Sequence, residues 1–147
     1  MSSVVKADIK ELDIIVDIDN QVIGNTSRRN DIAKSIELEQ CLVVKEDDGI
    51  AGFLLYDTNF FGCTFISLII VSPLKRRKGY ASLLINHLES IAPTQKVFSS
   101  TNRSNTAMQK VFDLNGFIES GFVDNLDEGD PELIYYKSKS SFQPRRL

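Results

Sequence analysis

The amino-acid sequence predicts an α/β fold, in which helices flank a mixed central β-sheet in the order β-α-α-β-β-β-α-β-α-β-β. Two observations predict this class. Apolar runs typical of strands are interspersed with segments whose apolar residues recur every three or four positions, as on one face of a helix. The chain of 147 residues, 42% hydrophobic and 25% charged, also has the size and composition of one ordinary globular domain. We therefore expect a single domain over residues 1–137 and a mobile tail over 138–147.

The first half of the chain is expected to contain a short strand, two helices and two longer strands. Apolar residues at helical spacing from Ile9 to Val22 predict the first helix, which the sequence Gly-Asn-Thr-Ser at 24–27 ends. The second helix is expected to bury Ile32 and Ile36. In chain order, these elements are a strand at 4–6, helices at 8–22 and 29–40, and strands at 41–45 and 50–56.

The most apolar segment of the chain, residues 64–71, is expected to be the central strand and to be buried on both faces. Pro73 has no N–H to donate to a neighbouring strand, so this strand must end before it. A helix is expected at 80–91, where apolar residues again recur at steps of three or four. Pro93 ends this helix.

The last third of the chain predicts a strand, a helix and a final pair of strands. Ser104 fits the N-cap of the helix, and Gly116 is expected to close it. The expected inner face of the helix consists of Ala107, Met108, Val111 and Phe112. The strands are expected at 96–101, 117–123 and 132–137.

The counts of charged and metal-binding residues exclude several functions. The chain carries 17 Lys and Arg against 20 Asp and Glu, a formal net charge of -3, so a dedicated nucleic-acid-binding face is not expected. His87 is the only histidine and Cys41 and Cys63 are the only cysteines, so a zinc site with several histidines is impossible and no metal is expected. A Ser-His-Asp or Cys-His centre would have to use His87.

The cysteines and the hydropathy pattern predict a soluble cytoplasmic protein. Residues 1–8 lack the apolar core of a secretory signal, so Cys41 and Cys63 are expected to stay reduced. The longest apolar run, residues 65–71, is too short to cross a membrane. We therefore expect neither a membrane nor a nucleic acid as a partner, and we expect a monomer or a homodimer.

A short basic loop after the central strand is the most informative segment of the sequence. Residues 75–78 read Lys-Arg-Arg-Lys, and Gly79 and Ala81 then open the amphipathic helix. This order gathers free backbone N–H groups, the positive end of a helix dipole and a glycine that permits close approach, which together suit a phosphate. The segment is not a P-loop, because no Gly-Lys-Ser/Thr follows the glycine, and it lacks the three-glycine spacing of a dinucleotide-binding fingerprint. A solvated basic loop without a ligand is the alternative interpretation.

The same segment resembles the acetyl-CoA signature of the GNAT family of N-acetyltransferases. Arg76-x-x-Gly79-x-Ala81, preceded by Val71-x-Pro73, matches the family pattern Gln/Arg-x-x-Gly-x-Gly/Ala after a central strand. A later set of residues matches the family's asparagine, its aromatic residue near a helix end and its Gly-Phe at the start of a strand. These residues are Asn105, Phe112, Gly116 and Phe117. The resemblance extends from the central strand to the last strand, about half of the chain.

The resemblance implies a GNAT-like fold that binds acetyl-CoA as the acyl donor. The backbone amides of the loop and of the first helical turn would bind the pyrophosphate. The end of the central strand would hydrogen-bond the pantetheine arm. The implied acetyl-CoA-binding residues are Ile69, Val71, Arg76, Arg77, Lys78, Gly79, Tyr80, Ala81, Ser82, Asn105 and Phe112.

Two departures from the family pattern leave the catalytic residues unassigned. Many members have a tyrosine as general acid where this chain has Phe112, which has no proton to give. Many also place a glutamate on the central strand as general base, whereas residues 65–71 contain no acidic residue and only Ser67 is polar. Carboxylates bordering the acceptor site would instead attract a cationic amine and relay its proton through water. These are Glu37, Glu39, Asp124, Asp127, Glu128, Asp130 and Glu132.

The function that the resemblance implies is acetyl transfer from acetyl-CoA to a primary amine. The acceptor would be a small molecule, a peptide or a protein, attacking directly in a ternary complex. The alternative is a non-enzymatic CoA-binding sensor or interaction module with the same fold. The missing tyrosine and glutamate favour this alternative, whereas the acetyl-CoA signature is common to both.

Overall fold

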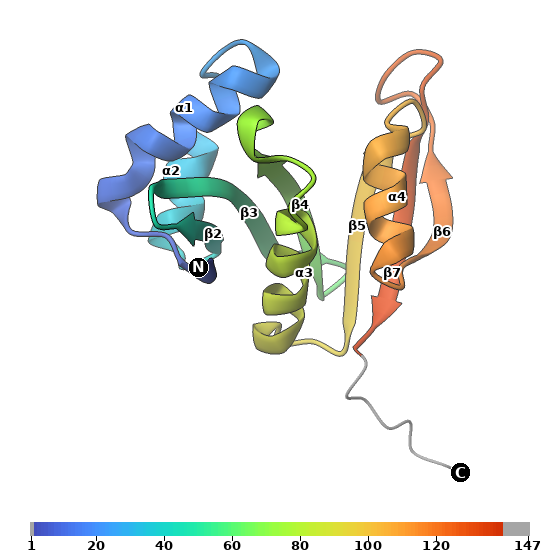
Figure 1. Ribbon diagram of the computed structural model, residues 1–147. Helices are drawn as coiled ribbons and strands as arrows, with labels where there is room; N and C mark the ends of the chain where they lie inside the picture. The colour runs from blue at the N-terminus through green and yellow to red at the C-terminus, as the bar shows by residue number, and fades with distance from the viewer. Residues whose placement is uncertain (1, 140–147) are drawn as a thin grey trace. The chain divides into compact units, whose positions relative to one another are not determined.

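The computed structural model describes residues 2–139 and contains the expected elements in the expected order (Figure 1). The strands are β1 (Ser3–Lys6), β2 (Cys41–Glu46), β3 (Gly49–Phe60), β4 (Cys63–Val71), β5 (Lys96–Asn102), β6 (Ile118–Val123) and β7 (Glu132–Ser138). The α-helices are α1 (Leu12–Ile23), α2 (Arg29–Glu37), α3 (Tyr80–Ile91) and α4 (Thr106–Leu114). Two short 3-10 helices, η1 (Ile9–Glu11) and η2 (Pro73–Lys75), precede α1 and follow β4.

The strands form a seven-stranded sheet in the order β1-β2-β3-β4-β5-β7-β6. β1–β2, β2–β3, β5–β7 and β6–β7 pair antiparallel, whereas β4 and β5 pair parallel over Thr64–Ile66 and Val97–Ser99. A parallel pair needs a crossover connection, and α3 lies between these two strands in the chain. The predicted α/β class, with a mixed sheet flanked by helices, is confirmed.

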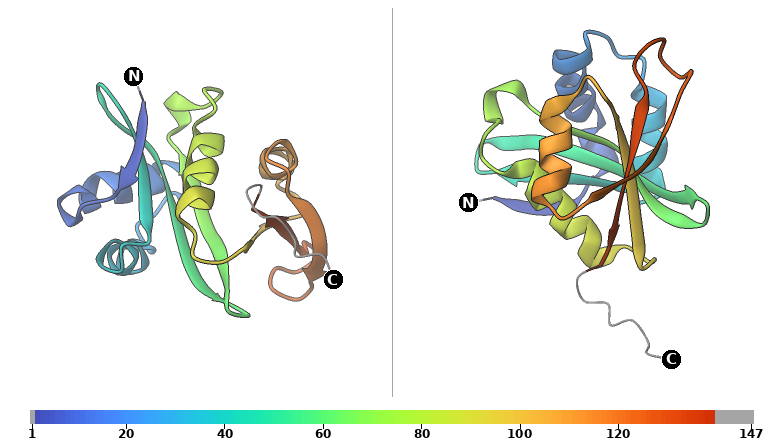
Figure 2. Two further views of the ribbon diagram at one scale, coloured as in Figure 1. Left: turned by 90° about the horizontal axis from the view of Figure 1, so that it is seen from below. Right: turned by 90° about the vertical axis from the view of Figure 1, so that its right-hand side faces the viewer.

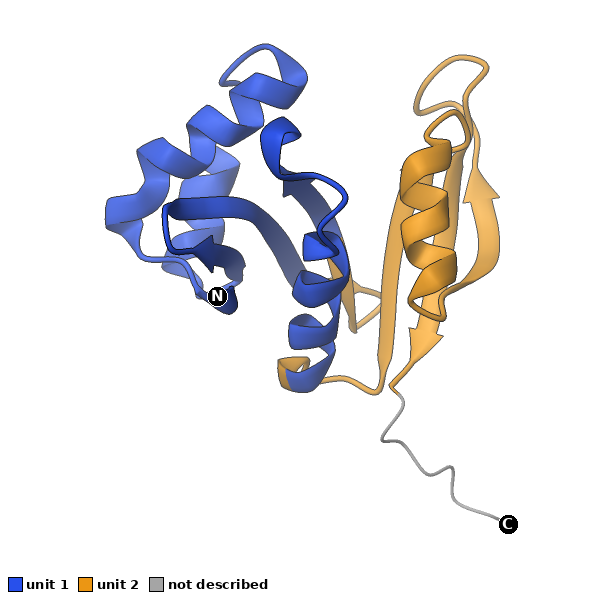
Figure 3. Cartoon of the chain, in the orientation of Figure 1, with its two compact units in different colours: residues 1–57, 67–90 blue, residues 58–66, 91–147 orange. Residues whose placement is uncertain are grey.

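The chain divides into two compact units (Figure 3). Unit 1 comprises residues 1–57 and 67–90, and unit 2 comprises residues 58–66 and 91–147. In unit 1, α1 and α2 lie on one side of the strands and α3 lies on the other (Figure 2). Alternate side chains of β2 and β3 face the two sides. The core on the α1–α2 side consists of Ile15, Val16, Ile18, Ile32, Ile36, Cys41, Val43, Phe53, Leu55 and Ile70.

In unit 2, α4 covers one face of the strands. Phe112 of α4 stacks on Tyr135 of β7 with ring centroids 4.8 Å apart, and it lies 5.4 Å from Phe117. On the opposite face, Phe98 of β5 lies 5.3 Å from Tyr136. Successive residues of a strand point to opposite faces, so Tyr135 is buried while Tyr136 is half-buried.

The strand buried on both faces is β3, not β4, and this part of the prediction was wrong. Residues 51–56 of β3 are all buried, since this strand lies between β2 and β4 and has helices on both sides within unit 1. In β4, Ser67 is exposed and Ile69 is half-buried. Apolar composition therefore located the middle strand of the sheet without locating its most buried one.

Helix α4 begins one residue later than expected, because Asn105 is its N-cap in place of Ser104. The Asn105 side chain accepts a hydrogen bond from Met108 N at 3.1 Å, while the Ser104 hydroxyl donates to Asp130 at 2.6 Å. Both residue types are good N-caps, so the local sequence did not distinguish them. Ala107, expected on the inner face, is exposed.

Several boundaries also differ from the predicted ones. Helix α2 ends at Glu37 rather than residue 40, and β3 extends to Phe60. At the C-terminus, Ser138 pairs with Lys96, so the last strand includes a residue expected in the tail. The backbone N–H of Lys139 also donates to Gln95 O at 3.0 Å. The rest of the expected tail, residues 140–147, lies outside the described residues.

Candidate functional site

The loop between β4 and α3 contains two residues with left-handed backbone. Arg77 has a φ of 66° and Gly79 a φ of 77°. For a residue with a side chain this conformation costs about 1–2 kcal/mol, and it persists only where neighbouring contacts support it. Gly79 avoids this cost, and a Cβ added there would meet no atom within 4 Å. The glycine is thus required by the backbone conformation and not by crowding.

The N-terminus of α3 presents backbone donors. The first hydrogen bond of the helix runs from Leu83 N to Gly79 O at 3.0 Å. The N–H groups of Gly79, Tyr80 and Ala81 precede this bond and have no acceptor within the helix. Together with the positive end of the helix dipole, such donors suit phosphate oxygens. The strand–loop–helix arrangement predicted from the sequence is therefore present at the predicted residues.

The basic side chains of the loop divide into two pairs. Lys75 and Lys78 form ion pairs with an acidic residue of unit 1, described below. Arg76 and Arg77 are exposed, and neither forms an ion pair with another residue in the range 2–139. The Arg76 Nε donates only a long hydrogen bond, 3.4 Å, to Val71 O. The two arginines are thus the loop cations left available to an anionic ligand.

Glu46, the last residue of β2, is the acidic partner of the loop. Its carboxylate oxygens lie 2.8 Å from Lys75 Nζ and 3.6 Å from Lys78 Nζ, and the Tyr80 hydroxyl donates a hydrogen bond to it. The hydrogen bonds from Lys75 and Tyr80 lower the pKa of Glu46 to about 2. This residue is therefore a carboxylate throughout the neutral pH range.

Sequence reasoning did not single out Glu46, which lies between the strands expected at 41–45 and 50–56. The available signal was an acidic run at 46–48 and a basic run at 75–78, which have complementary charges. That signal does not show that the two runs meet. Their contact depends on how β2 and β4 are ordered around β3 in unit 1.

Asn105 and Phe112, the second set of the family resemblance, both have structural contacts within unit 2. The Asn105 side chain caps α4. The Phe112 ring is 1% exposed and packs against Phe117 and Tyr135. Their implied contribution to acetyl-CoA binding stays a prediction.

The exposed part of β4 offers backbone groups and no acid or base. The Ser67 hydroxyl donates to Leu55 O at 3.3 Å. Ile69 and Val71 are half-buried and lie beyond Ile66, the last residue of the parallel ladder. The role implied for these two residues, backbone hydrogen bonds to the pantetheine arm, stays a prediction.

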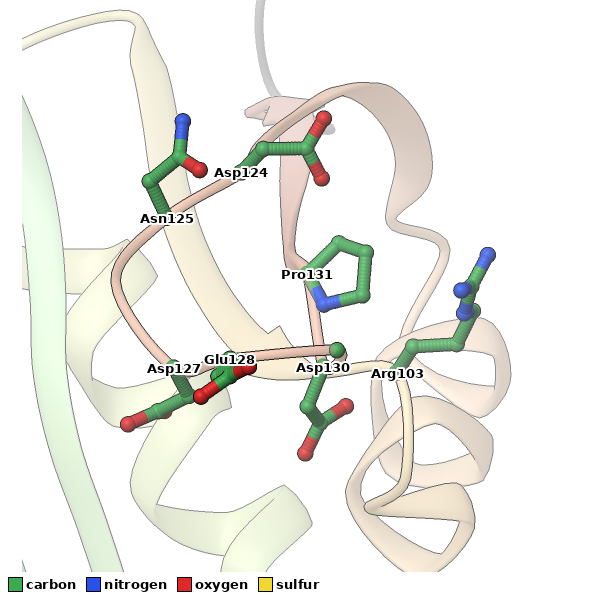
Figure 4. A pocket seen from close by; sticks show the side chains of 8 residues that line it. Arg103, Asp124, Asn125, Asp127, Glu128, Asp130 and Pro131 are labelled. Carbon is green, nitrogen blue, oxygen red and sulfur yellow. The ribbon is translucent and has the colours of Figure 1, made fainter.

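The acidic residues between β6 and β7 surround a cavity of about 320 Å³ in unit 2 (Figure 4). It is lined by Arg103, Asp124, Asn125, Asp127, Glu128, Gly129, Asp130 and Pro131. Two of its carboxylates are already hydrogen-bonded within the unit. Asp130 accepts from Ser104 N at 3.0 Å, and Asp127 accepts from Asn102 Nδ2 at 2.9 Å. These two carboxylates therefore bind the β6–β7 loop to the end of β5 and to the connection between β5 and α4.

The other three predicted carboxylates lie at two separate places. Glu132 accepts a hydrogen bond from the Ser100 hydroxyl at 2.6 Å, within unit 2. Glu37 and Glu39 are exposed at the end of α2 in unit 1, where Glu39 lies 3.6 Å from Lys6 Nζ. None of these contacts identifies a general base.

The cysteines are not arranged as nucleophiles. Cys41 is buried, and its burial raises the pKa of its thiol to about 12, whereas Cys63 is half-buried.

At about pH 8 we expect a disulfide reagent to modify one thiol per folded chain and both thiols in urea, because only the thiolate reacts. Replacing Cys63 by Ser should abolish the reaction of the folded protein. Rapid modification of the folded Cys63→Ser variant would contradict this assignment.

Comparison with known proteins identifies the family. The model of the Acetyltransferase (GNAT) family matches residues 13–117. The chain belongs to this family. A GNAT-family acetyltransferase from Bacillus cereus ATCC 10987, known from its crystal structure, is 65% identical, with a TM-score of 0.92 over 95% of this chain and 98% of that one.

Two more distant structures share the GNAT fold. The yncA protein of Salmonella typhimurium, solved with its cofactor acetyl-CoA, is 14% identical, with a TM-score of 0.79 over 99% of this chain and 98% of that one. The ribosomal-protein-S18-alanine N-acetyltransferase of Escherichia coli is 16% identical, with a TM-score of 0.80 over 100% of this chain and 99% of that one. At these identities the likeness concerns the fold alone. The chain matched none of the curated proteins.

Within residues 2–139, no helix is both long and apolar enough to span a membrane. In the same range, no three or more His, Cys, Asp or Glu side chains are grouped so that they could hold a metal ion.

Replacing Phe112 by Tyr, the residue usual in the GNAT family, is expected to lower stability without raising turnover. The ring is 1% exposed and lies against two other aromatic rings, so an added hydroxyl would be buried among them. Burying it costs about 1–2 kcal/mol, which urea unfolding can measure. Faster acetyl transfer by the variant would instead indicate that the hydroxyl reaches the reacting atoms.

Proposed function

We propose that this GNAT protein is an N-acetyltransferase that uses acetyl-CoA to acetylate a primary amine. The observation that carries the proposal is the loop before α3. There Arg77 and Gly79 have left-handed backbone, the first helical N–H groups have no acceptor within the helix, and two arginines are exposed. These features together suit a doubly charged pyrophosphate.

In the proposed complex, the residues predicted from the sequence bind different parts of acetyl-CoA. The backbone amides and cationic side chains of 76–82 bind the pyrophosphate, with Arg76 and Arg77 as the main cations. The backbone of Ile69 and Val71 hydrogen-bonds the pantetheine arm, because these residues lie past the end of the β4–β5 ladder. This assignment agrees with the family membership and needs no metal ion.

The proposed chemistry is direct transfer in a ternary complex. The lone pair of a neutral amine attacks the carbonyl carbon of the thioester, the C–N bond forms, and the C–S bond breaks with its electrons leaving on the CoA sulfur. The proton lost by nitrogen passes through water to the departing thiolate. Backbone N–H groups near the end of β4 stabilise the negative charge that develops on the carbonyl oxygen.

Positioning is the main source of rate in this proposal. Phe112 is buried and has no proton, and β4 carries no carboxylate. Holding two reactants in a productive geometry can supply up to roughly 7–11 kcal/mol, and a thiolate is a tolerable leaving group. The acidic residues at 124–130 would attract a cationic amine. The proposed setting is the cytoplasm, where thiols stay reduced.

A CoA-binding sensor is the second candidate. It is favoured by Phe112, which has no proton to give, and by the absence of a carboxylate on β4. Calorimetry with acetyl-CoA tests what both candidates share, and lack of binding at sub-millimolar concentration would refute both. Release of CoA thiol with polyamines, amino acids, aminoglycosides and peptide N-termini then separates them. Turnover with any of these amines supports the enzyme, whereas binding without thiol release across the panel supports the sensor.

A further inference from the structure

One carboxylate from β2 holds the basic loop at several points. Glu46 contacts Lys75, Lys78 and Tyr80, and its side chain is only 13% exposed. The neighbouring Asp48 is 71% exposed and lies 3.0 Å from Lys75 Nζ, the loop cation it shares with Glu46. Glu46 therefore contacts residues at both ends of the loop.

The contacts of Glu46 lie on both sides of the strained residue. Arg77, with its φ of 66°, comes after Lys75 and before Lys78 and Tyr80 in the chain. A left-handed residue with a side chain is retained only where surrounding contacts over-determine it. By holding the residues before and after Arg77, the carboxylate supplies that support.

The same contacts decide which cations remain for a ligand. Glu46 pairs with the lysines at 75 and 78, whereas Arg76 and Arg77 stay exposed and have no ion pair within residues 2–139. Arginine presents several donors in a fixed fork and binds phosphate with more directional contacts than lysine does. The arrangement therefore leaves the arginines facing solvent beside the N-terminus of α3.

We infer that Glu46 is a positioning residue for acetyl-CoA, an inference that rests on the proposed function. Its carboxylate does not bind the ligand but holds the loop in the conformation in which the amides of α3 and the two arginines meet the pyrophosphate together. Preorganisation of this kind strengthens binding, because the loop is already ordered before the ligand arrives. If Glu46 acted only through its negative charge, removing that charge would strengthen acetyl-CoA binding, because a carboxylate repels a pyrophosphate. The positioning role predicts weaker binding instead.

The test compares Glu46→Ala and Glu46→Gln with the wild type by calorimetry with acetyl-CoA. We expect the alanine variant to bind about tenfold more weakly, because three contacts are lost. The glutamine variant should be intermediate, since its amide oxygen still accepts from Tyr80. In turnover assays, KM for acetyl-CoA should rise while kcat stays within about twofold. Asp48→Asn is the matched control, with the same loss of charge but a single affected contact, and it should bind as the wild type does.

A second measurement keeps this inference separate from the proposed function. Hydrogen exchange of a peptide spanning residues 72–84, without ligand, should be faster in both Glu46 variants than in the wild type and in Asp48→Asn. Unchanged exchange in the Glu46 variants, or affinity for acetyl-CoA that is unchanged or higher, would overturn the inference. If the wild type itself binds no acetyl-CoA, the proposed function and the positioning role both fail. The exchange data then decide only whether Glu46 orders the loop.

Discussion

Replacing Gly79 by Glu is expected to reduce the affinity for acetyl-CoA by more than about 100-fold, which is about 2.7 kcal/mol, while the fold is retained. The new carboxylate would lie at the N-terminus of α3, beside the N–H groups that are proposed to bind the pyrophosphate. There it would accept their hydrogen bonds and repel the ligand's negative charge. Calorimetry with acetyl-CoA measures the loss, and circular dichroism checks the fold.

The fold should survive because the added side chain meets no steric obstacle. An ideal Cβ at Gly79 has no neighbour within 4 Å, so the cost is confined to the left-handed backbone, about 1–2 kcal/mol. Gly62→Glu is a matched control. Gly62 has a φ of 75° and equally open surroundings, but it lies in the turn between β3 and β4. The control should lose similar stability and no affinity, whereas tight acetyl-CoA binding by Gly79→Glu would refute the assignment of the loop.

The parts of the fold that were predicted correctly depend on local signals. Helix α3 was expected at 80–91 and is observed at Tyr80–Ile91, because a glycine precedes it, a proline follows it and its apolar residues keep a helical period. The order of strands and helices followed from the same kind of pattern. Boundaries at less definite signals, such as the ends of α2 and β3, differ by three or four residues.

The parts that were missed depend on tertiary contacts. Ser104 and Asn105 are equivalent N-cap candidates in the sequence, and the difference is that Asp130 hydrogen-bonds Ser104. The burial of β3 depends on which strands and helices lie beside it. No pattern along the chain reports either fact.

In the candidate site, too, local signals were informative and features that depend on tertiary contacts were missed. The loop proposed to bind the pyrophosphate was predicted from a local motif, since strand, basic run, glycine and helix follow one another in the chain. The positive charge that this loop offers to a ligand could not be predicted in the same way, because Glu46, on β2, offsets part of it. The sequence suggested four cations available to a ligand, whereas the structure leaves Arg76 and Arg77 without ion pairs within residues 2–139. That Phe112 stands where many family members have a tyrosine, and that residues 65–71 contain no acidic residue, are properties of the sequence itself, and the general acid and base stay unassigned.

Replacing Gly52 by Ala is expected to destabilise the protein by about 3 kcal/mol, at the upper end of the range for overpacked sites. An ideal Cβ on Gly52 would lie 2.7 Å from Ile70 O and 3.1 Å from Val71 Cα, so the backbone of β4 has to move. Secondary-structure propensity alone predicts that the substitution stabilises the protein, because Ala in a strand is favoured over Gly by about 0.5–1 kcal/mol. Urea unfolding of the variant and the wild type measures the difference.

The displaced backbone is the end of β4 that is proposed to hold the pantetheine arm, so the same substitution tests function. The hydrogen bond from Ser72 N to Ala51 O, 2.8 Å, joins β3 to the start of the loop one residue away. Moving β4 away from Gly52 lengthens this hydrogen bond and shifts the loop that follows β4. The Gly52→Ala variant should therefore bind acetyl-CoA more weakly. Gly62→Ala, which adds the same methyl group in open space, should lose about 1 kcal/mol and no affinity. A stabilised Gly52→Ala variant with normal affinity would show that β4 adjusts freely, and the close approach of the two strands would then have no role in placing the ligand.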